Sequence, residues 1–152
     1  MSAQSVLIHN AHASASVSPT FSRQSAALVR RILAAEKRKS YEVSLILTTN
    51  PAIRNLNRKY RKKDRATDVL AFGFYPDRPT RTDYGDIYIS LDRARQQATA
   101  YRVTFNQELR RLIVHGVLHL CGYDHQSTRA EKALTRKTED WLKPGPRIKK
   151  QR

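Results

Sequence analysis

The spacing of three histidines constrains this chain more than any other feature. They lie in one eleven-residue stretch, His115-Gly-Val-Leu-His119-Leu-Cys-Gly-Tyr-Asp-His125. Because side chains four residues apart on a helix project from the same face, His115 and His119 predict a helix with both rings on one side. Gly122 can adopt the left-handed backbone that ends a helix and turns the chain sharply. We therefore expect a helix and a tight turn that brings His125 back toward the first two rings.

Three neutral imidazoles arranged in this way form a zinc site whose fourth position is open, with Zn–N distances of about 2.0–2.1 Å. We therefore predict one Zn2+ ion per chain, bound by His115, His119 and His125. The other two histidines of the sequence, His9 and His12, are predicted to be surface residues.

The helix that carries the histidines separates a metal face from a packing face. At about 100° per residue, one stripe holds the two histidines together with Glu108 and Arg111. A second stripe, which is predicted to face the core, holds Leu109, Ile113, Gly116 and Leu120. Gly116 has no side chain, so it could let a neighbouring element or a substrate approach the helix closely.

The same ligand spacing occurs in the long zinc-protease motif H-E-x-x-H-x-x-G-x-x-H. Gly116 stands where those proteases carry the glutamate that acts as general base. A protease would therefore need another proton acceptor, and Asp124 and Glu108 are the candidates. Asp124 could instead be a turn residue or a partner for a histidine N–H, and Glu108 could form a surface salt bridge.

Hydrophobic patterning predicts strands at residues 6–8, 41–49, 67–74 and 85–90, and helices at residues 21–39, 50–60, 91–101, 104–120 and 127–142. In the second helix, Pro51 at the first helical position predicts Asn50 as the N-cap. That helix is expected to bury Ile53, Leu56 and Tyr60. In the fourth, Thr104 and Gln107 have the spacing of a capping box.

A chain of 152 residues fits one domain. Mixed strands and helices predict the α/β (α+β) class: a single small domain with a mixed β-sheet packed with helices, and the metal site at the end of a helix in the C-terminal half. We assign residues 1–142 to one metal-dependent hydrolase domain and residues 143–152 to a basic, flexible tail. Residues 75–83, with two prolines, are predicted to form a mobile loop.

The charge of the chain predicts a polyanionic partner. Lys and Arg number 29 against 13 Asp and Glu, which gives a net charge of +16. A field of this sign attracts nucleic acid. Four arginines, Arg54, Arg58, Arg61 and Arg65, would form one stripe if the second helix continued far enough, and this stripe is predicted to contact phosphate groups. A solvated helix face is the alternative.

Several features predict a cytoplasmic protein with no membrane contact. No stretch approaches eighteen consecutive apolar residues. The first nineteen residues contain no Lys or Arg, unlike an export signal, although their Ser/Ala-rich composition leaves an organelle transit segment as an alternative. Cys121 is the single cysteine, so no intrachain disulfide forms. We expect it to be a small buried side chain, and a fourth metal ligand only if the helix has ended before it.

The chain resembles the YbeY family of zinc-dependent endoribonucleases that mature ribosomal RNA. The resemblance covers about residues 43–142. It depends on the histidine motif and on the segments Leu56-Asn-Arg-Lys-Tyr-Arg-Lys-Lys-Asp64, Thr67-Asp-Val-Leu-Ala-Phe72 and Gly85-Asp-Ile-Tyr-Ile-Ser90. It implies a small α/β fold, three zinc ligands at His115, His119 and His125, and a functionally important Arg61 at the substrate.

Two segments depart from the family pattern. The family's Y-R-G-K-D has Lys62 in place of its glycine, and its P-T-D-V-L-S-F-P has Ala66, Ala71 and Gly73 in place of the first proline, the serine and the last proline. The metal ligands are unaffected. The shape of the loop between Arg61 and Thr67 is therefore the feature that the resemblance describes least well.

We therefore predict a metal-dependent endoribonuclease that acts on ribosomal RNA in rRNA maturation and ribosome quality control, with Arg61 as a catalytic residue. The resemblance also implies small-subunit ribosomal proteins and an assembly GTPase as partners. Two alternatives stay open: a metalloprotease-like hydrolase, and a non-catalytic ribosome-assembly factor whose zinc is structural.

Overall fold

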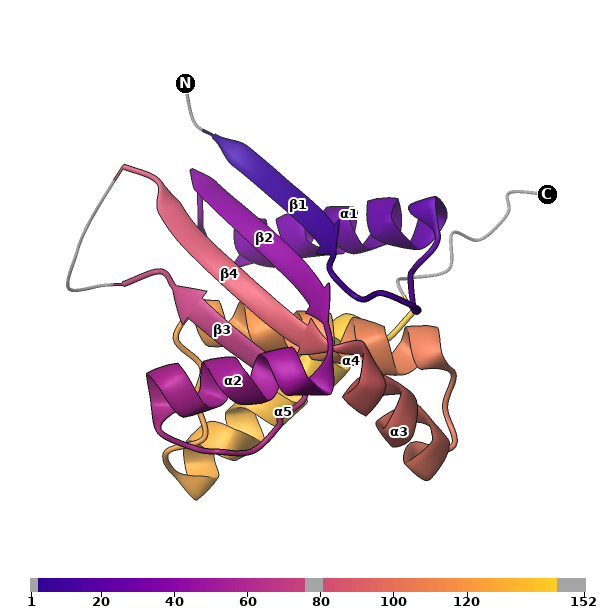
Figure 1. Cartoon of the computed structure of the whole chain (residues 1–152). Coiled ribbons are helices and arrows are strands. Elements are labelled where there is room, and N and C mark those ends of the chain that lie inside the picture. The colour runs from indigo at the N-terminus through magenta and orange to yellow at the C-terminus, as the bar shows by residue number, and fades with distance from the viewer. Residues whose placement is uncertain (1–2, 76–80, 145–152) are drawn as a thin grey trace.

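The computed structural model describes residues 3–75 and 81–144, and in these ranges five helices surround one four-stranded sheet (Figure 1). The strands have the order β1-β2-β4-β3, in which β1, β2 and β4 are parallel and β3 is antiparallel to β4. The predicted α/β (α+β) class with a mixed sheet is confirmed. In chain order the elements are β1 (Gln4–Asn10), α1 (Pro19–Ala35), β2 (Tyr41–Thr48), α2 (Asn50–Arg61), β3 (Val69–Gly73), β4 (Asp83–Ser90), α3 (Leu91–Tyr101), α4 (Phe105–Leu120) and α5 (Thr128–Leu142).

Part of the prediction falls outside these ranges. Residues 145–152 of the predicted tail and residues 76–80 of the predicted loop are not among the described residues. The division into a domain of residues 1–142 and a flexible tail stays a prediction. Within the described ranges, no helix has both the length and the hydropathy needed to cross a lipid bilayer.

The two faces of the sheet differ in what covers them. Along β2, Val43 and Leu45 are buried on the inner face, against which α1 and α4 pack, while Glu42 on the outer face is exposed. On the outer face, α2 lies against β3 and β4 (Figure 1). The alternation follows from the two-residue repeat of a strand. The sheet therefore has one fully covered face and one that α2 covers in part.

Helix α4 approaches the sheet closely at Gly116. A Cβ atom at this position would lie 2.6 Å from Ile87 Cγ2 and 3.2 Å from Val69 Cγ2. The neighbouring element that the missing side chain admits is therefore the sheet itself. The other residues predicted for the packing stripe, Leu109, Ile113 and Leu120, are buried as expected.

The ends of the helices show which boundaries can be predicted from the neighbouring residues and which cannot. The capping box of α4 is present, with Gln107 N–H donating to Thr104 Oγ1 and Thr104 N–H donating to Gln107 Oε1. The predicted N-cap of α2 is wrong by one residue, because Thr49 Oγ1 accepts the N–H of Ala52. The first helix ends at Ala35 rather than at residue 39, since Lys37 adopts a left-handed φ of 61°.

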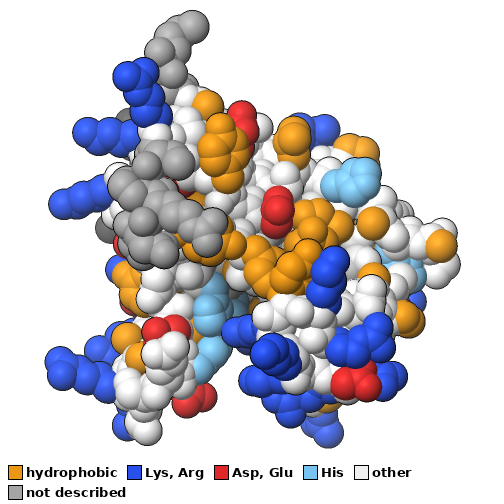
Figure 2. All heavy atoms as spheres, turned by 60° about the vertical axis from the view of Figure 1, so that its left-hand side comes forward, with side chains coloured by type: hydrophobic (Ala, Val, Ile, Leu, Met, Phe, Trp, Pro, Cys, Tyr) orange, Lys and Arg blue, Asp and Glu red, His pale blue; other side chains and the backbone are white. Residues whose placement is uncertain are grey.

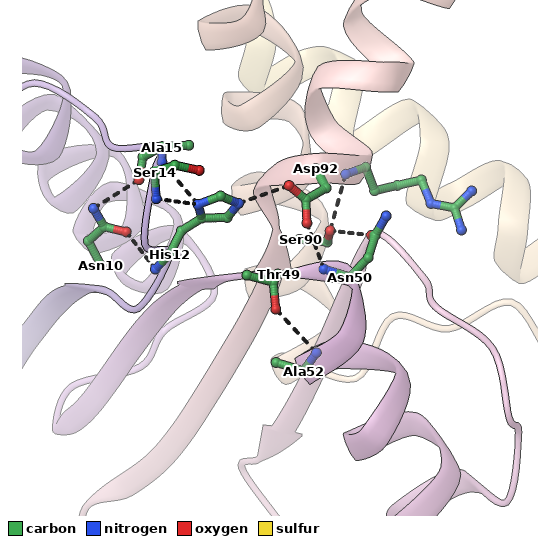
Figure 3. A network of polar contacts seen from close by, with 10 residues as sticks. Asn10, His12, Ser14, Ala15, Thr49, Asn50, Ala52, Ser90 and Asp92 are labelled. Atoms are coloured by element: carbon green, nitrogen blue, oxygen red, sulfur yellow. Dashed lines mark hydrogen bonds and ion pairs between the residues drawn. The ribbon is translucent and has the colours of Figure 1, made fainter.

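A polar network engages the Asn50 side chain, because Ser90 Oγ donates to Asn50 Oδ1 at 2.6 Å, and the same network shields the His12 ring from solvent (Figure 3). Backbone N–H groups of Ser14 and Ala15 donate to His12 Nδ1 at 3.2 and 2.9 Å. The ring proton therefore sits on Nε2, which donates to Asp92 Oδ1 at 2.8 Å, while Asp92 Oδ2 accepts the N–H of Asn50. With a side-chain exposure of 9%, His12 is not the predicted surface residue, whereas His9 is exposed.

The close approach at Gly116 makes a prediction about stability. Ile87 Cγ2 is fixed on a branched carbon and cannot rotate away independently, so we expect Gly116→Ala to lower the free energy of unfolding by about 1–3 kcal/mol in urea titrations. The double variant with Ile87→Leu, which removes that methyl group, should recover part of the loss. If the two changes are additive, the contact does not limit the packing.

Candidate metal centre

Three histidine rings converge at the C-terminal end of α4. The ring centroids of His115, His119 and His125 are 5.0–5.1 Å apart in all three pairs. The Nε2 atoms of His115 and His125 are 3.2 Å apart, and one ring nitrogen from each histidine lies within 4.8 Å of the others. The structure thus brings together the three residues that the sequence spacing singled out.

The backbone after α4 explains how His125 reaches the helix. Gly122 has a φ of 101°, its N–H donates to the carbonyl of His119, and Tyr123 N–H donates to the carbonyl of Leu118. These two bonds form a Schellman motif, which reverses the chain direction. Asp124 Oδ1 then accepts the N–H of Gln126 in a second tight turn. His125 lies within this second turn.

The donor set fits a divalent cation. Two ligands of a tetrahedral zinc ion are about 3.3 Å apart when the Zn–N bonds are about 2.0–2.1 Å long, and the 3.2 Å between the Nε2 atoms of His115 and His125 is close to that value. His115 and His119 are half-buried, whereas His125 is exposed, so the cluster is open to solvent on one side.

Electrostatics keeps the first two rings neutral. Burial, followed by the neighbouring rings of His119 and His125, lowers the pKa of His115 from 6.5 to about 4, although Asp68 acts in the opposite direction. Burial, His125 and Arg61 lower the pKa of His119, while Asp124 and Asp68 oppose them. A neutral imidazole has a free lone pair, so these shifts favour cation binding at neutral pH.

Of the two carboxylates predicted as proton acceptors, Glu108 is unavailable. It is 1% exposed, and its oxygens accept hydrogen bonds from the Arg111 guanidinium and from Gln97 Nε2. It is therefore a buried ion pair rather than the predicted surface salt bridge. Asp124 is half-buried and lies close enough to act on His119.

Asp68 is a site residue that the sequence analysis missed. It is half-buried just before β3, its Oδ1 accepts the N–H of Val69, and its charge acts on His115, His119 and Arg111. The available signal was its place near the start of the strand predicted at residues 67–74, close to the arginine-rich segment. Nothing in that local pattern shows that β3 runs beside α4, so its relation to the histidines depends on the tertiary fold.

The predicted arginine stripe does not form as one surface. Helix α2 ends at Arg61, and Lys62 turns the chain with a left-handed φ of 56°. Arg54 binds both carboxylate oxygens of Asp64, at 2.9 and 3.2 Å. Together with Arg58 and Arg65, this pair lines a separate pocket of about 680 Å³. Of the four arginines, Arg61 is the one whose charge acts on a histidine of the cluster.

Cys121 is the C-cap of α4 and does not belong to the histidine cluster. Burial raises the pKa of its thiol to about 11, and the charged groups that act on it are Arg38, Glu36 and Asp83. The thiol is therefore protonated at neutral pH, and it is half-buried rather than fully buried.

The histidine cluster lies in a hollow beside a basic surface. Figure 2 shows histidine side chains in a cleft near the middle of this face, with Lys and Arg side chains gathered along one side of the cleft. The exposed cations at the end of α2 and in the loop after it are Arg61, Lys62, Lys63 and Arg65. This distribution gives the hollow the sign of charge that attracts phosphate groups.

Comparison with known proteins identifies the family. The family model described as "Endoribonuclease YbeY" matches residues 7–144. The chain belongs to the YbeY family. A protein named Endoribonuclease YbeY from Halalkalibacterium halodurans is 40% identical over 139 residues, which cover 81% of this chain and 87% of the relative. Another of that name, from Desulfitobacterium hafniense, is 47% identical over 116 residues, which cover 71% of this chain and 73% of the relative.

A solved structure shares the YbeY fold of this chain. The solution structure of TM1509 from Thermotoga maritima superposes with a TM-score of 0.62 at 26% sequence identity, and the match covers 90% of this chain and 86% of that one. The resemblance noted from the sequence motifs is thereby confirmed over more of the chain than residues 43–142.

One departure from the family motif now has a physical reading. Lys62 replaces the glycine of Y-R-G-K-D and adopts a φ of 56° and a ψ of 33°, a conformation that is unfavourable for residues with a Cβ. We expect Lys62→Gly to raise the free energy of unfolding by about 0.5–1 kcal/mol in urea titrations. Lys62→Ala is the matched control, because it removes the same charge and keeps the strain. Equal stability of the two variants would contradict this reading.

The depressed pKa of His115 predicts the pH dependence of the metal-free protein. Between pH 6.5 and about 4 the unfolded chain binds a proton at this residue that the folded chain does not. The contribution of neutral His115 to the stability of the folded chain is therefore fully present above about pH 6.5, and it is lost as the pH falls toward about 4. In urea titrations with EDTA, the free energy of unfolding should depend less on pH for His115→Asn than for the parent. If it changes with pH equally in both proteins, the pKa of His115 is not lowered by folding.

Proposed function

We propose that this YbeY-family chain is a metal-dependent endoribonuclease that acts on ribosomal RNA in rRNA maturation and ribosome quality control. The observation that carries the proposal is the convergence of three ring nitrogens within 4.8 Å, two of the rings half-buried, beside the positive charge of Arg61. The relatives from Halalkalibacterium halodurans and Desulfitobacterium hafniense are named endoribonucleases, which supports RNA as the substrate.

We assign His115, His119 and His125 as the ligands of one zinc ion per chain. The neutral imidazoles leave the full charge of the cation uncompensated, and nitrogen donors suit zinc. When bound, such an ion supplies a Lewis acid for phosphodiester hydrolysis.

Arg61 is the proposed catalytic residue of the chain itself. Its planar guanidinium can donate two hydrogen bonds to the oxygens of one phosphate group and stabilise the negative charge that develops there. Lys62 and Lys63 follow it on the exposed surface and would bind neighbouring phosphates of the backbone. Asp68 and Asp124 are carboxylates close enough to act on the histidines, and either can accept a proton or orient an imidazole N–H.

The structure disfavours a protease of the long zinc motif. The position of that motif's glutamate is Gly116, which is buried and faces Ile87 of the sheet, so a glutamate there would point into the core rather than at the histidines. The partners proposed besides ribosomal RNA are small-subunit ribosomal proteins and an assembly GTPase. The proposed compartment is the cytoplasm.

The function is tested by incubating zinc-loaded protein with purified ribosomal RNA. We expect cleavage that EDTA abolishes, and about 100- to 1,000-fold slower cleavage by Arg61→Ala, because a group that stabilises transition-state charge is lost. Metal analysis should give one zinc ion per parent chain and a loss of zinc in His119→Ala.

Matched variants separate catalysis from general charge. Arg61→Lys keeps the charge but not the two-pronged geometry, so its activity should stay well below that of the parent. Arg23→Ala removes an exposed arginine on α1 and should cleave at the parent rate. If His119→Ala and Arg61→Ala remain folded and cleave like the parent, a contaminating nuclease is responsible, and the non-catalytic assembly factor becomes the better reading.

A further inference from the structure

The outer face of the sheet carries a row of aromatic rings that starts at the C-terminal end of α2. The rings of Tyr60 and Phe72 meet edge to face with centroids 5.5 Å apart, and those of Phe72 and Tyr88 do so at 6.0 Å. Tyr60 immediately precedes Arg61, whose charge acts on His119. The row therefore begins at the residue next to Arg61 in the chain and runs across β3 to β4.

Helix α2 covers only one end of this face. Ile53 of α2 and Leu70 of β3 are fully buried. Farther along, Tyr60 is 59% exposed, Tyr84 is 58% exposed and Leu7 is 63% exposed. The sequence pattern predicted Tyr60 as a buried contact of α2, and this prediction is wrong. Single exposed tyrosines are ordinary, but an exposed ring that is continuous with further aromatic rings forms a patch of the kind that marks binding surfaces.

Charges around the row are separated into two sides. The acidic groups of the outer sheet face are Asp86, which pairs with Phe72 in the strand register, and Glu42, and both are exposed. The cations lie on the helix side, where Lys59 Nζ is 5.2 Å from the Tyr60 ring centroid. Phosphate groups would therefore be attracted to the end of α2 and repelled from the sheet, so a nucleic acid strand would direct its bases toward the rings.

We propose that Tyr60, supported by Phe72 and Tyr88, is a stacking subsite for an unpaired base of the RNA whose backbone passes Arg61. The proposal rests on the proposed function and adds a specific binding site to it. Aromatic rings beside a basic groove are a common way to hold single-stranded nucleic acid, because every base has a face that can stack. Figure 2 shows the arrangement that this requires, with hydrophobic side chains gathered directly beside the histidine-lined cleft.

The subsite is tested with two ligands that differ only in their bases. One is an unstructured RNA oligonucleotide of about eight nucleotides, and the other is its abasic ribose-phosphate analogue of equal length. Binding is measured in EDTA so that the RNA stays intact. We expect Tyr60→Leu to bind the oligonucleotide about 5- to 150-fold more weakly than the parent does and to bind the abasic analogue equally well.

Control variants isolate the ring. Tyr60→Leu keeps an apolar contact with Phe72, and its thermal unfolding should resemble that of the parent. Tyr60→Phe should retain the affinity, because the ring rather than the hydroxyl group stacks. Tyr101→Leu on α3 removes a ring of similar exposure, 58%, from outside the row and should not change binding.

Each other outcome overturns the subsite in a recognisable way. If Tyr60→Leu weakens both ligands equally, the ring does not recognise bases. If Tyr60→Leu binds RNA like the parent but no longer associates with ribosomal subunits, the face docks a protein instead. If the parent cleaves ribosomal RNA and Tyr60→Leu matches it in binding and cleavage, the subsite is wrong while the proposed function stands. If the parent neither binds nor cleaves RNA, the proposed function fails as well.

Discussion

The contact between α4 and the sheet at Gly116 is the constraint on which the rest of the structure depends. One residue earlier in the chain, His115 projects about 100° around the same helix, so the depth at which α4 sits against Ile87 and Val69 sets where the rings lie. The same contact brings the start of β3, with Asp68, within electrostatic reach of the histidines. Core packing and site geometry are thus two results of one close approach.

The features that could be predicted from the sequence are those decided within a few residues. The capping box of α4, the bounds of α3, the turn at Gly122 and the convergence of the three histidines all follow from spacing and backbone preference. The errors about side-chain burial have a different cause, because they concern side chains whose surroundings come from distant segments. The His12 ring is largely shielded from solvent where α3 supplies Asp92, and Tyr60, near the end of α2, is 59% exposed on the part of the sheet that no other described element covers.

The positions of the charged side chains, and not only their number, bear on the function of this protein. The net charge of +16 indicates a polyanionic partner but does not say where it binds. In the fold, Arg54 is bound to Asp64 and Arg111 to Glu108, so neither guanidinium is wholly free for a phosphate group. The cations that follow α2 remain exposed beside rings kept neutral by burial. The arrangement combines a site for a cation with a surface for an anion, which is what a metal-assisted phosphodiesterase requires.

The turn that carries His125 has a consequence for how the centre assembles. His115 and His119 are held in place by a regular helix, whereas His125 is exposed within a tight turn that follows the Gly122 turn and leads into α5. Two donors are therefore preorganised, and ion capture has to immobilise mainly the third. Coordination would then act as a cross-link between residues ten positions apart in the chain and restrict the hinge between α4 and α5. Stiffness in this part of the molecule would thus depend on metal supply.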